Sequence, residues 1–231
     1  MKPFVDHSFG DALGAVAVPG WCHGVWQRER LASPGAEDRD TRVIWVQTPV
    51  LFADLRSPPP GQAGDEQGFA GNLLVSGRIC AWQRPLDIQP VTGPGDAGAM
   101  YRDGTYMLEC GIHDNYIEDW RQIADGTRHL AATRGAVRIA DGEIHWPAEG
   151  TLELLVACGG HVIHAIRDGA RASLRYGVFD DASGQMTPQW AVGSKAATVA
   201  ADMPWVLWHD AMKPVARDAL LASLEVLVPA G

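Results

Sequence analysis

The stretch "IWVQTPVLFADLR" at residues 44–56 decides the fold. Its β-branched and aromatic residues favour strands, and Thr48 and Pro49 divide it into two short ones, because proline removes a donor and interrupts strand pairing. Residues two apart on a strand share a face. One face of each strand is therefore aliphatic, whereas the other is both aromatic and charged. The mixed face carries Trp45, Gln47, Phe52, Asp54 and Arg56.

The same mixed face recurs in other segments of the first half of the chain. The sets that share a face are Trp26 with Arg28, Trp82 with Arg84, and Tyr116 with Glu118 and Trp120, and Asp87 and Gln89 form a further polar pair. A face turned to solvent does not need so many tryptophans. We therefore expect these faces to point inward and to line a pocket for an amphipathic small molecule.

Short strand-like segments separated by glycine-containing turns predict an antiparallel barrel or sandwich. The expected strands are 23–31, 41–48, 50–56, 69–76, 78–84, 98–102, 105–110, 114–123, 136–140, 143–147, 151–158, 161–167, 172–179, 187–193 and 223–228. One helix is expected within 210–224, after Pro214. Two loops rich in proline and glycine, 57–68 and 89–99, fit either the rim of a site or a disordered insertion.

The predicted organisation is one barrel at residues 21–195, with an N-terminal extension at 1–20 and a C-terminal extension at 196–231 packed on the barrel. An alternative is two smaller barrels, at about 21–125 and 130–231.

Composition limits the partners. The chain of 231 residues has a formal charge of −9 and no run of Lys or Arg that could follow a phosphate backbone, so we expect no nucleic acid. No apolar run approaches the roughly 20 residues that span a bilayer, and the apolar segment 12–20 lacks a basic region before it. We expect a cytoplasmic protein with no membrane contact. Its four widely spaced cysteines are expected to be free thiols, mostly buried.

The charged residues of the mixed faces have two interpretations. The three arginines Arg28, Arg56 and Arg84 match three acids in number, Asp54, Asp87 and Glu118, so all six could form buried ion pairs that fix the strand register. Alternatively, they bind a ligand, and we favour a mixture in which one arginine is left free for an anionic group of the ligand. Buried pairs add little net stability, because desolvating each ion costs several kcal/mol.

The runs "GVWQRERL…DTRVIWVQTPVLFADLR", "GFAGNLLVSGRICAWQRPLDIQPVTGPGDAG" and "MLECGIHDNYIEDWRQI" together resemble the HRI-type family of calycin-like proteins of fungi and bacteria. The resemblance covers roughly residues 23–190. It implies an antiparallel calycin-like β-barrel, related in shape to lipocalins, and no particular reaction. The positions that it marks as a signature are Trp26, Arg28, Trp45, Gln47, Asp54, Arg56, Trp82, Asp87, Gln89, Tyr116, Glu118 and Trp120.

Three functions remain open for this all-β chain. The first is binding without turnover, with Arg28, Arg56 or Arg84 as the anchor and the aromatic residues as walls. The second is a cofactor-independent lyase, isomerase, cyclase or hydrolase in the same pocket, with Asp54 or Glu118 as the acid/base group, Tyr116 as its partner and His113 nearby. The third is an interaction module with an inert barrel. A homodimer is compatible with each of them.

No cofactor or metal site is predicted. His161 and His164 are three apart in an expected strand, so they lie on opposite faces and cannot easily share a metal. Haem on a single histidine, His164 or His113, is an alternative by analogy with other calycin barrels. Cys110 and His113 lie close in sequence but lack a third group to orient a base, so Cys110 is expected to be an inward-packing strand residue.

Overall fold

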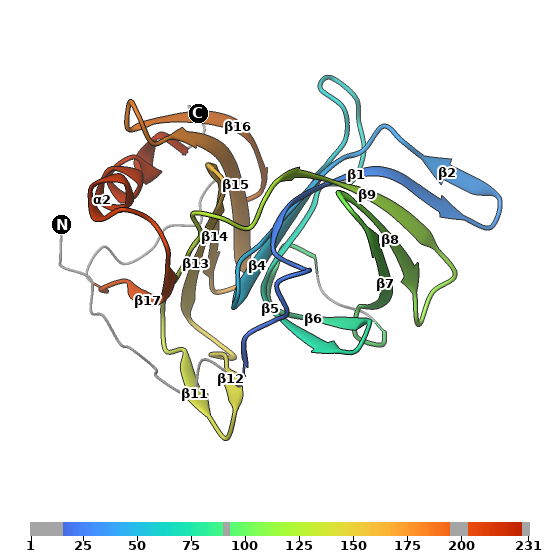
Figure 1. Cartoon of the computed structure of the whole chain (residues 1–231), viewed down its shortest axis with the longest axis horizontal. Coiled ribbons are helices and arrows are strands. Elements are labelled where there is room, and N and C mark those ends of the chain that lie inside the picture. Colours follow the sequence, from blue (N-terminus) through green and yellow to red (C-terminus); the bar gives the residue numbers. More distant parts are fainter. Residues whose placement is uncertain (1–15, 90–92, 195–202, 228–231) are drawn as a thin grey trace.

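The computed structural model describes residues 16–89, 93–194 and 203–227. Most of the expected N-terminal extension and part of the C-terminal one lie outside these residues. The described chain is all-β except for a short helical segment near its end, as expected (Figure 1). None of the described helices is long and apolar enough to cross a bilayer.

Eight antiparallel strands form a closed barrel, because the first and last of them, β1 and β9, also pair with each other. In order of pairing the barrel strands are β1 (Gly24–Ser33), β3 (Arg42–Gln47), β4 (Leu51–Ser57), β5 (Gln67–Ser76), β6 (Ile79–Asp87), β7 (Ala97–Asp103), β8 (Tyr106–Gly111) and β9 (Ile117–Ala124). The short strand β2 (Ala36–Asp38) extends β1 outside the barrel. The closed antiparallel barrel predicted from the sequence is confirmed, and it is consistent with a calycin-like fold.

A second sheet of six strands follows the barrel in sequence. In order of pairing its strands are β16 (Gln185–Gly193), β15 (Arg171–Asp180), β14 (His161–Asp168), β13 (Thr151–Cys158), β10 (Leu130–Arg134) and β17 (Val206–Asp210). A small hairpin of β11 (Arg138–Ala140) and β12 (Glu143–His145) projects from it. The division of the chain into domains stays a prediction, because the barrel and this sheet share one packed interface.

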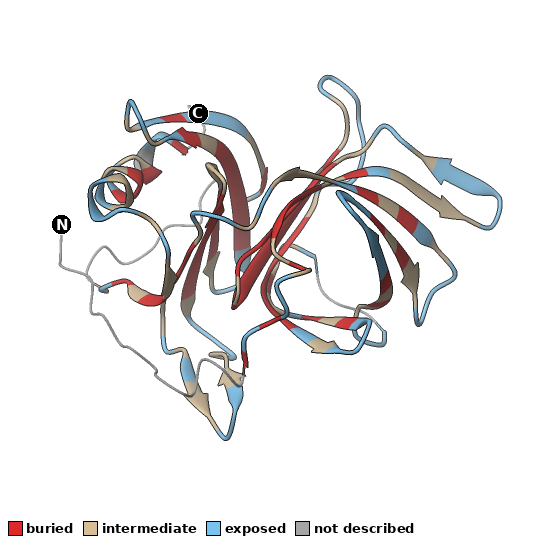
Figure 2. Cartoon of the chain, viewed as in Figure 1, coloured by how far each residue is buried: buried red, intermediate tan, exposed pale blue. Residues whose placement is uncertain are grey.

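That interface is the outer wall of the barrel. The aliphatic residues of β3 and β4, such as Val46 and Leu55, pack with Leu154 and other residues of the second sheet in one buried core (Figure 2). The register pairs Trp45 with Asp54 on the opposite, inner side of the same two strands. The alternation in residues 44–56 therefore separates two environments, an aliphatic interface outside the barrel and a mixed interior.

The turn between these strands fits the sequence prediction. β3 ends at Gln47 and β4 begins at Leu51. The Thr48 hydroxyl donates to the Leu51 carbonyl at 2.8 Å and accepts from the Leu51 amide at 3.0 Å. Pro49 needs no partner for an amide donor, because it has none.

The helix begins at Pro214, as predicted, and runs to Ala222 (α2); a 3-10 turn, Leu224–Leu227 (η1), follows it. The expected strand at 223–228 is therefore wrong. Leu224 and Leu227, three residues apart, lie on one side of the 3-10 turn and pack against the second sheet. The alternating apolar residues in this segment had a helical explanation as well as a strand one.

Candidate functional site

The barrel interior has an aromatic half and a charged half. The aromatic half is filled by side chains: Trp45 lies 6.3 Å from Trp26, 6.0 Å from Trp82 and 5.7 Å from Trp120, measured between ring centroids. All four tryptophans are buried. Their indoles pack edge-on or stacked in the ways that aromatic pairs prefer. This half of the barrel is a core.

Gln47, the last residue of β3, contacts that core and the turn that follows the strand. Its side-chain amide donates to the Thr48 carbonyl at 2.8 Å, and its oxygen accepts from the Trp45 indole at 3.3 Å. Phe52 packs against Phe69, at 6.0 Å between centroids. The contacts of Gln47 join the turn after β3 to the aromatic core, and the contact of Phe52 with Phe69 extends that core.

The charged half begins above Phe69. The Arg84 guanidinium stacks on the Phe69 ring at 3.6 Å from its centroid, and that of Arg56 lies 5.3 Å from it. A guanidinium over an aromatic face is attracted by the ring quadrupole. Phe69 is thus the boundary between the two halves.

Each of the three predicted arginines contacts two carboxylates. Arg28 donates to Glu118 and to Asp38, each at 2.7 Å. Arg56 donates to Asp54 at 2.9 Å, and its Nη1 lies 3.5 Å from Glu118. Arg84 lies 2.7 Å from Asp87 and 3.1 Å from Asp96. All three arginines are therefore paired, as the ion-pair interpretation requires, and the favoured version with one arginine left free is wrong. The five carboxylates outnumber the arginines.

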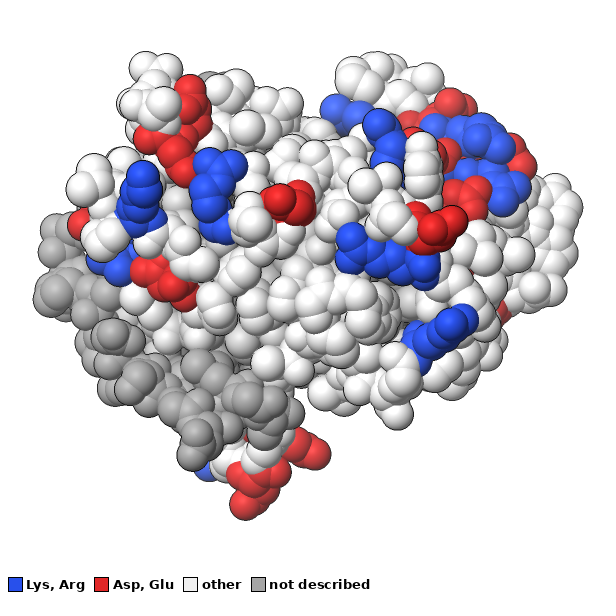
Figure 3. Space-filling model, in the orientation of Figure 1, with Lys and Arg blue, Asp and Glu red and all other residues white. Residues whose placement is uncertain are grey.

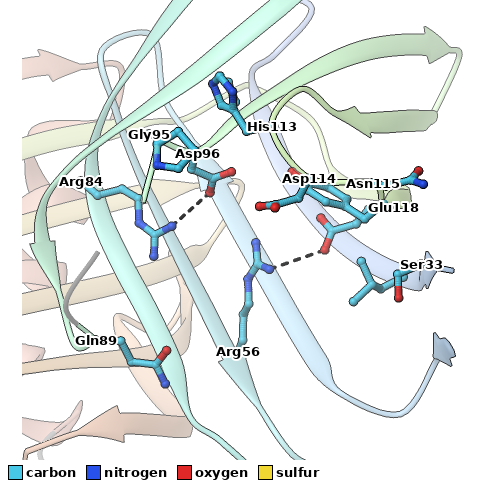
Figure 4. A pocket seen from close by; sticks show the side chains of 14 residues that line it. Ser33, Arg56, Arg84, Gln89, Gly95, Asp96, His113, Asp114, Asn115 and Glu118 are labelled. Atoms are coloured by element: carbon cyan, nitrogen blue, oxygen red, sulfur yellow. Dashed lines mark hydrogen bonds and ion pairs between the residues drawn. The ribbon is translucent and has the colours of Figure 1, made fainter. Parts of the chain in front are cut away.

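A pocket of about 470 Å³ opens at this end of the barrel (Figure 4). Arg56, Arg84, Asp96, Asp114 and Glu118 contribute charged groups to it, and the two ion pairs drawn there join Arg56 to Glu118 and Arg84 to Asp96. The remaining lining residues are Leu31, Ser33, Gln89, Pro94, Gly95, Ala97, His113, Asn115 and Tyr116. Part of the 89–99 loop therefore forms the rim of the pocket.

The structure separates the predicted site residues into three groups. Arg56, Arg84, Gln89, His113, Tyr116 and Glu118 line the pocket. Beneath it, Arg28 and Asp54 belong to the buried ion-pair network, together with the more exposed Asp87. The aromatic side chains Trp26, Trp45, Phe52, Trp82 and Trp120 and the amide of Gln47 lie in the core. Their role as ligand contacts stays a prediction.

Glu109 is a functional candidate that the sequence prediction missed. It points inward from β8, directly opposite Glu118 on β9, and is 3% exposed. Burial, followed by the charge of Glu118, raises the pKa of its carboxyl well above the usual range. No signal in the sequence marked it, because Met107 and Glu109 alternate with Leu108 and Cys110, which are at least as apolar.

Cys110 does not face inward, so that expectation is wrong. It pairs with Ala99 and with the exposed Ile117, on the outer side of the barrel. The inward positions of β8 are Met107 and Glu109, which are buried. Cys22, Cys80 and Cys158 are buried free thiols, as expected.

The histidines proposed for haem lie in different places. His113 is exposed at the pocket rim, whereas His164 is buried in the second sheet, with its Nε2 2.6 Å from Glu153 Oε2. His161 lies on the opposite face and contacts the Tyr176 hydroxyl at 2.6 Å. Within the described residues no group of three His, Cys, Asp or Glu side chains could hold a metal ion.

Charged side chains also surround the barrel on its outside. On the face drawn in Figure 3, basic and acidic residues alternate around β1, β2 and β9. Arg30 pairs with Asp119 at 2.6 Å, and Arg121 pairs with Glu29 at the same distance. Basic and acidic groups are therefore paired with each other on this surface.

Comparison with family models, with curated proteins and with solved structures gave no match. The resemblance to the HRI-type family therefore stays a prediction beyond the barrel itself. A closed barrel with an open mouth is compatible with small-molecule binding.

Proposed function

We propose that this protein binds a small organic molecule in the pocket at the charged end of the barrel, which we call the mouth pocket. A polar group of the ligand would point at the charged residues at the base of this pocket. The observation that supports this most is the pocket itself. It measures about 470 Å³, within the roughly 300–1,000 Å³ of small-molecule sites, and ends on Arg56, Arg84 and Glu118. Leu31, Pro94 and Ala97 offer apolar contacts near the rim for the rest of the molecule.

Arg56 and Arg84 are already paired with carboxylates, which restricts the kind of polar group that a ligand can place beside them. An anion that approached Arg56 or Arg84 would compete with carboxylates already in place, and Asp96 and Glu118 would repel it. Like charges at close range cost energy even at a partly solvated site. We therefore favour a ligand whose polar group is neutral over one with a free carboxylate. The ligand should also be more polar than one that would suit the tryptophan-lined cavity expected from the sequence.

A ligand screen with a pocket-filling variant tests this proposal. Ligand-observed NMR with a library of small neutral, acidic and basic compounds identifies binders. Ser33, which lines the pocket, is replaced by Trp to fill it, and Ser33→Ala is the matched control. We expect binding to be lost in the tryptophan variant and kept in the alanine variant. Binders that ignore Ser33→Trp, or a library without binders, would favour the inert interaction module.

Acid/base catalysis in the same pocket is the second candidate, and one contact favours it. Tyr116 lines the pocket, and its hydroxyl donates to Glu109 Oε1 at 2.8 Å. Asp54 is less suitable than Glu118, because Glu118 is among the residues that line the pocket and Asp54 is not. Loss of the α-protons of acetophenone in deuterated water, followed by NMR, tests for such chemistry. Exchange that exceeds buffer and disappears in Tyr116→Phe would support an enzyme.

A further inference from the structure

The outer side of β7 and β8 is apolar and exposed. These two strands lie across the barrel from β3 and β4, on the side away from the second sheet (Figure 1). Among the described residues, eight large apolar side chains are exposed, and five of them lie on this wall, each between 39% and 58% exposed. They are Ile79, Tyr101, Tyr106, Ile112 and Ile117. Single exposed apolar residues are ordinary, but a cluster of them marks an interaction site.

The strand register joins these side chains into continuous rows. One row crosses four strands and consists of Ile79, Ala99, Cys110 and Ile117. The row on one side of it pairs Tyr101 with Leu108. On the other side, the Ile112 amide donates to the Ala97 carbonyl at 2.9 Å, which places Ile112 beside β7. We call these outward residues from β6 to β9 the outer apolar face.

Charged groups lie at two margins of the outer apolar face. Arg78, in the turn before β6, forms no ion pair within the described chain, and its guanidinium lies 5.0 Å from the centroid of the Tyr101 ring. On the β9 margin, Asp119 contacts Arg30 through one oxygen and its side chain is 36% exposed. Both margins are level with Tyr101. The Arg78 carbonyl accepts from the amide of the residue before Tyr101, and Leu108 pairs with both Tyr101 and Asp119.

We propose that the protein forms a homodimer through the outer apolar face, about a twofold axis that runs between β7 and β8 and parallel to them. A twofold interface brings the same patch of both copies together, so the patch must complement itself. About this axis β7 of each copy faces β8 of the other, and the small side chain of Ala97 lies opposite the larger one of Ile112. β6 likewise faces β9, and Arg78 lies opposite Asp119. Small side chains thus meet larger ones, and the basic margin meets the acidic one.

The size of the outer apolar face fits a weak dimer. Its five large side chains present on the order of 400 Å² of surface, in the range of roughly 300–600 Å² for the largest patch of a typical monomer, which is often functional. The smaller residues between them and the charged margins raise this area toward the roughly 800 Å² per partner of a standard interface. Tyrosine, present here as Tyr101 and Tyr106, is enriched in such interfaces. We therefore expect a dissociation constant in the micromolar range.

Sedimentation velocity of the full chain, at protein concentrations from about 1 to about 200 µM, resolves monomer and dimer across a micromolar dissociation constant. Ala99→Glu puts a charge between Ile79 and Cys110, at the centre of the face, and should leave a monomer at every concentration. Val215→Glu is the matched control, because Val215 is 82% exposed on α2, outside the face, and this variant should dimerise normally. Both variants should unfold cooperatively in urea, which separates loss of the dimer from loss of the fold.

Charge reversal tests the twofold axis. Arg78→Glu places an acid opposite Asp119, and Asp119→Arg places a base opposite Arg78, so each single variant should weaken the dimer about tenfold. The double variant restores opposite charges across the interface and should recover the affinity to within about threefold of the original. A merely structural effect of losing the Arg30 contact would not be reversed by Arg78→Glu.

Three outcomes overturn the proposal. A chain that stays monomeric at about 200 µM, well above a micromolar dissociation constant, does not use this face for a second copy and leaves it to a different protein. A dimer that persists in Ala99→Glu is formed through another surface. A dimer that Ale99→Glu dissociates but that both charge reversals leave unchanged does not have the twofold axis between β7 and β8. Because none of these measurements involves a ligand, their results do not bear on binding in the mouth pocket.

Discussion

Replacing Arg28 by Met should destabilise the protein by about 3 kcal/mol. The substitution leaves the Glu118 carboxylate, whose side chain is 3% exposed, with only Arg56 Nη1 at 3.5 Å. Breaking a buried pair costs about 3–5 kcal/mol, because an uncompensated charge stays behind. The remaining contact with Arg56 places the expected loss at the lower end, and Asp38, which is 32% exposed, can turn to water.

Arg121→Met is a matched control. The Arg121–Glu29 pair joins the same two strands, β9 and β1, but on the outside, where the two side chains are 45% and 40% exposed. An exposed pair of this kind is worth less than about 1 kcal/mol. The pair within the barrel and the pair outside it therefore differ chiefly in burial.

Urea unfolding followed by tryptophan fluorescence measures both variants, since the indoles of Trp26, Trp45 and Trp120 are in the barrel core. With a slope of about 2–3 kcal/mol per M, Arg28→Met should lower the midpoint by about 1 M and Arg121→Met by a few tenths. Adding Glu118→Gln to Arg28→Met should recover part of the loss. Equal midpoints for Arg28→Met and Arg121→Met would refute the reasoning.

Three further predictions follow from the packing. Trp45→Ala removes the indole that contacts three other tryptophans and should cost about 3–5 kcal/mol in urea unfolding; a loss below 1 kcal/mol would mean that the aromatic half is loosely packed. Burial lowers the pKa of His23, His129 and His209, so the unfolded state binds more protons than the folded state. The unfolding free energy should therefore decline as the pH falls below about 6.5. The double variant His129→Gln with His209→Gln should flatten that pH profile, and an unchanged profile would contradict the prediction. Burial raises the pKa of Cys158 to about 12, and Cys22 and Cys80 are buried as well. An aromatic disulfide reagent should therefore modify at most one thiol per folded chain, that of Cys110. Cys110→Ser should abolish the reaction.

The barrel was predicted mainly from the alternation of aliphatic residues with aromatic or charged residues along the strands. Trp45 and Val46 are neighbours in sequence, and the pleat alone sends one inward and the other to the second sheet. Three strands were not expected, namely Ala36–Asp38, Leu130–Arg134 and Val206–Asp210. Leu130–Arg134 contains two alanines and little β propensity, and pairing with β13 and β17 on its two sides makes it a strand. Such pairing overrides local preference.

The candidate site was less accessible to sequence reasoning. Arg56 and Glu118 are 62 positions apart in the numbering, and only closure of the barrel by β1 and β9 brings them to 3.5 Å. Asp96 lies in a loop rich in glycine and proline, where no periodicity indicates which way a side chain points. Glu109 is a single acid in an otherwise uncharged strand, so its inward position depended on the register with Glu118.

The shared wall of β3 and β4 bears on how the chain reaches its native state during synthesis. Residues 24–124 leave the ribosome before the second sheet and hold every strand of the barrel, yet most residues that cover its outer face, such as Leu154 and Leu174, come later in the chain. A nascent barrel would expose this aliphatic surface while translation continues at about 5–20 residues per second. The interval is several seconds at that rate, and during it the nascent chain is a substrate for chaperones or a source of aggregation.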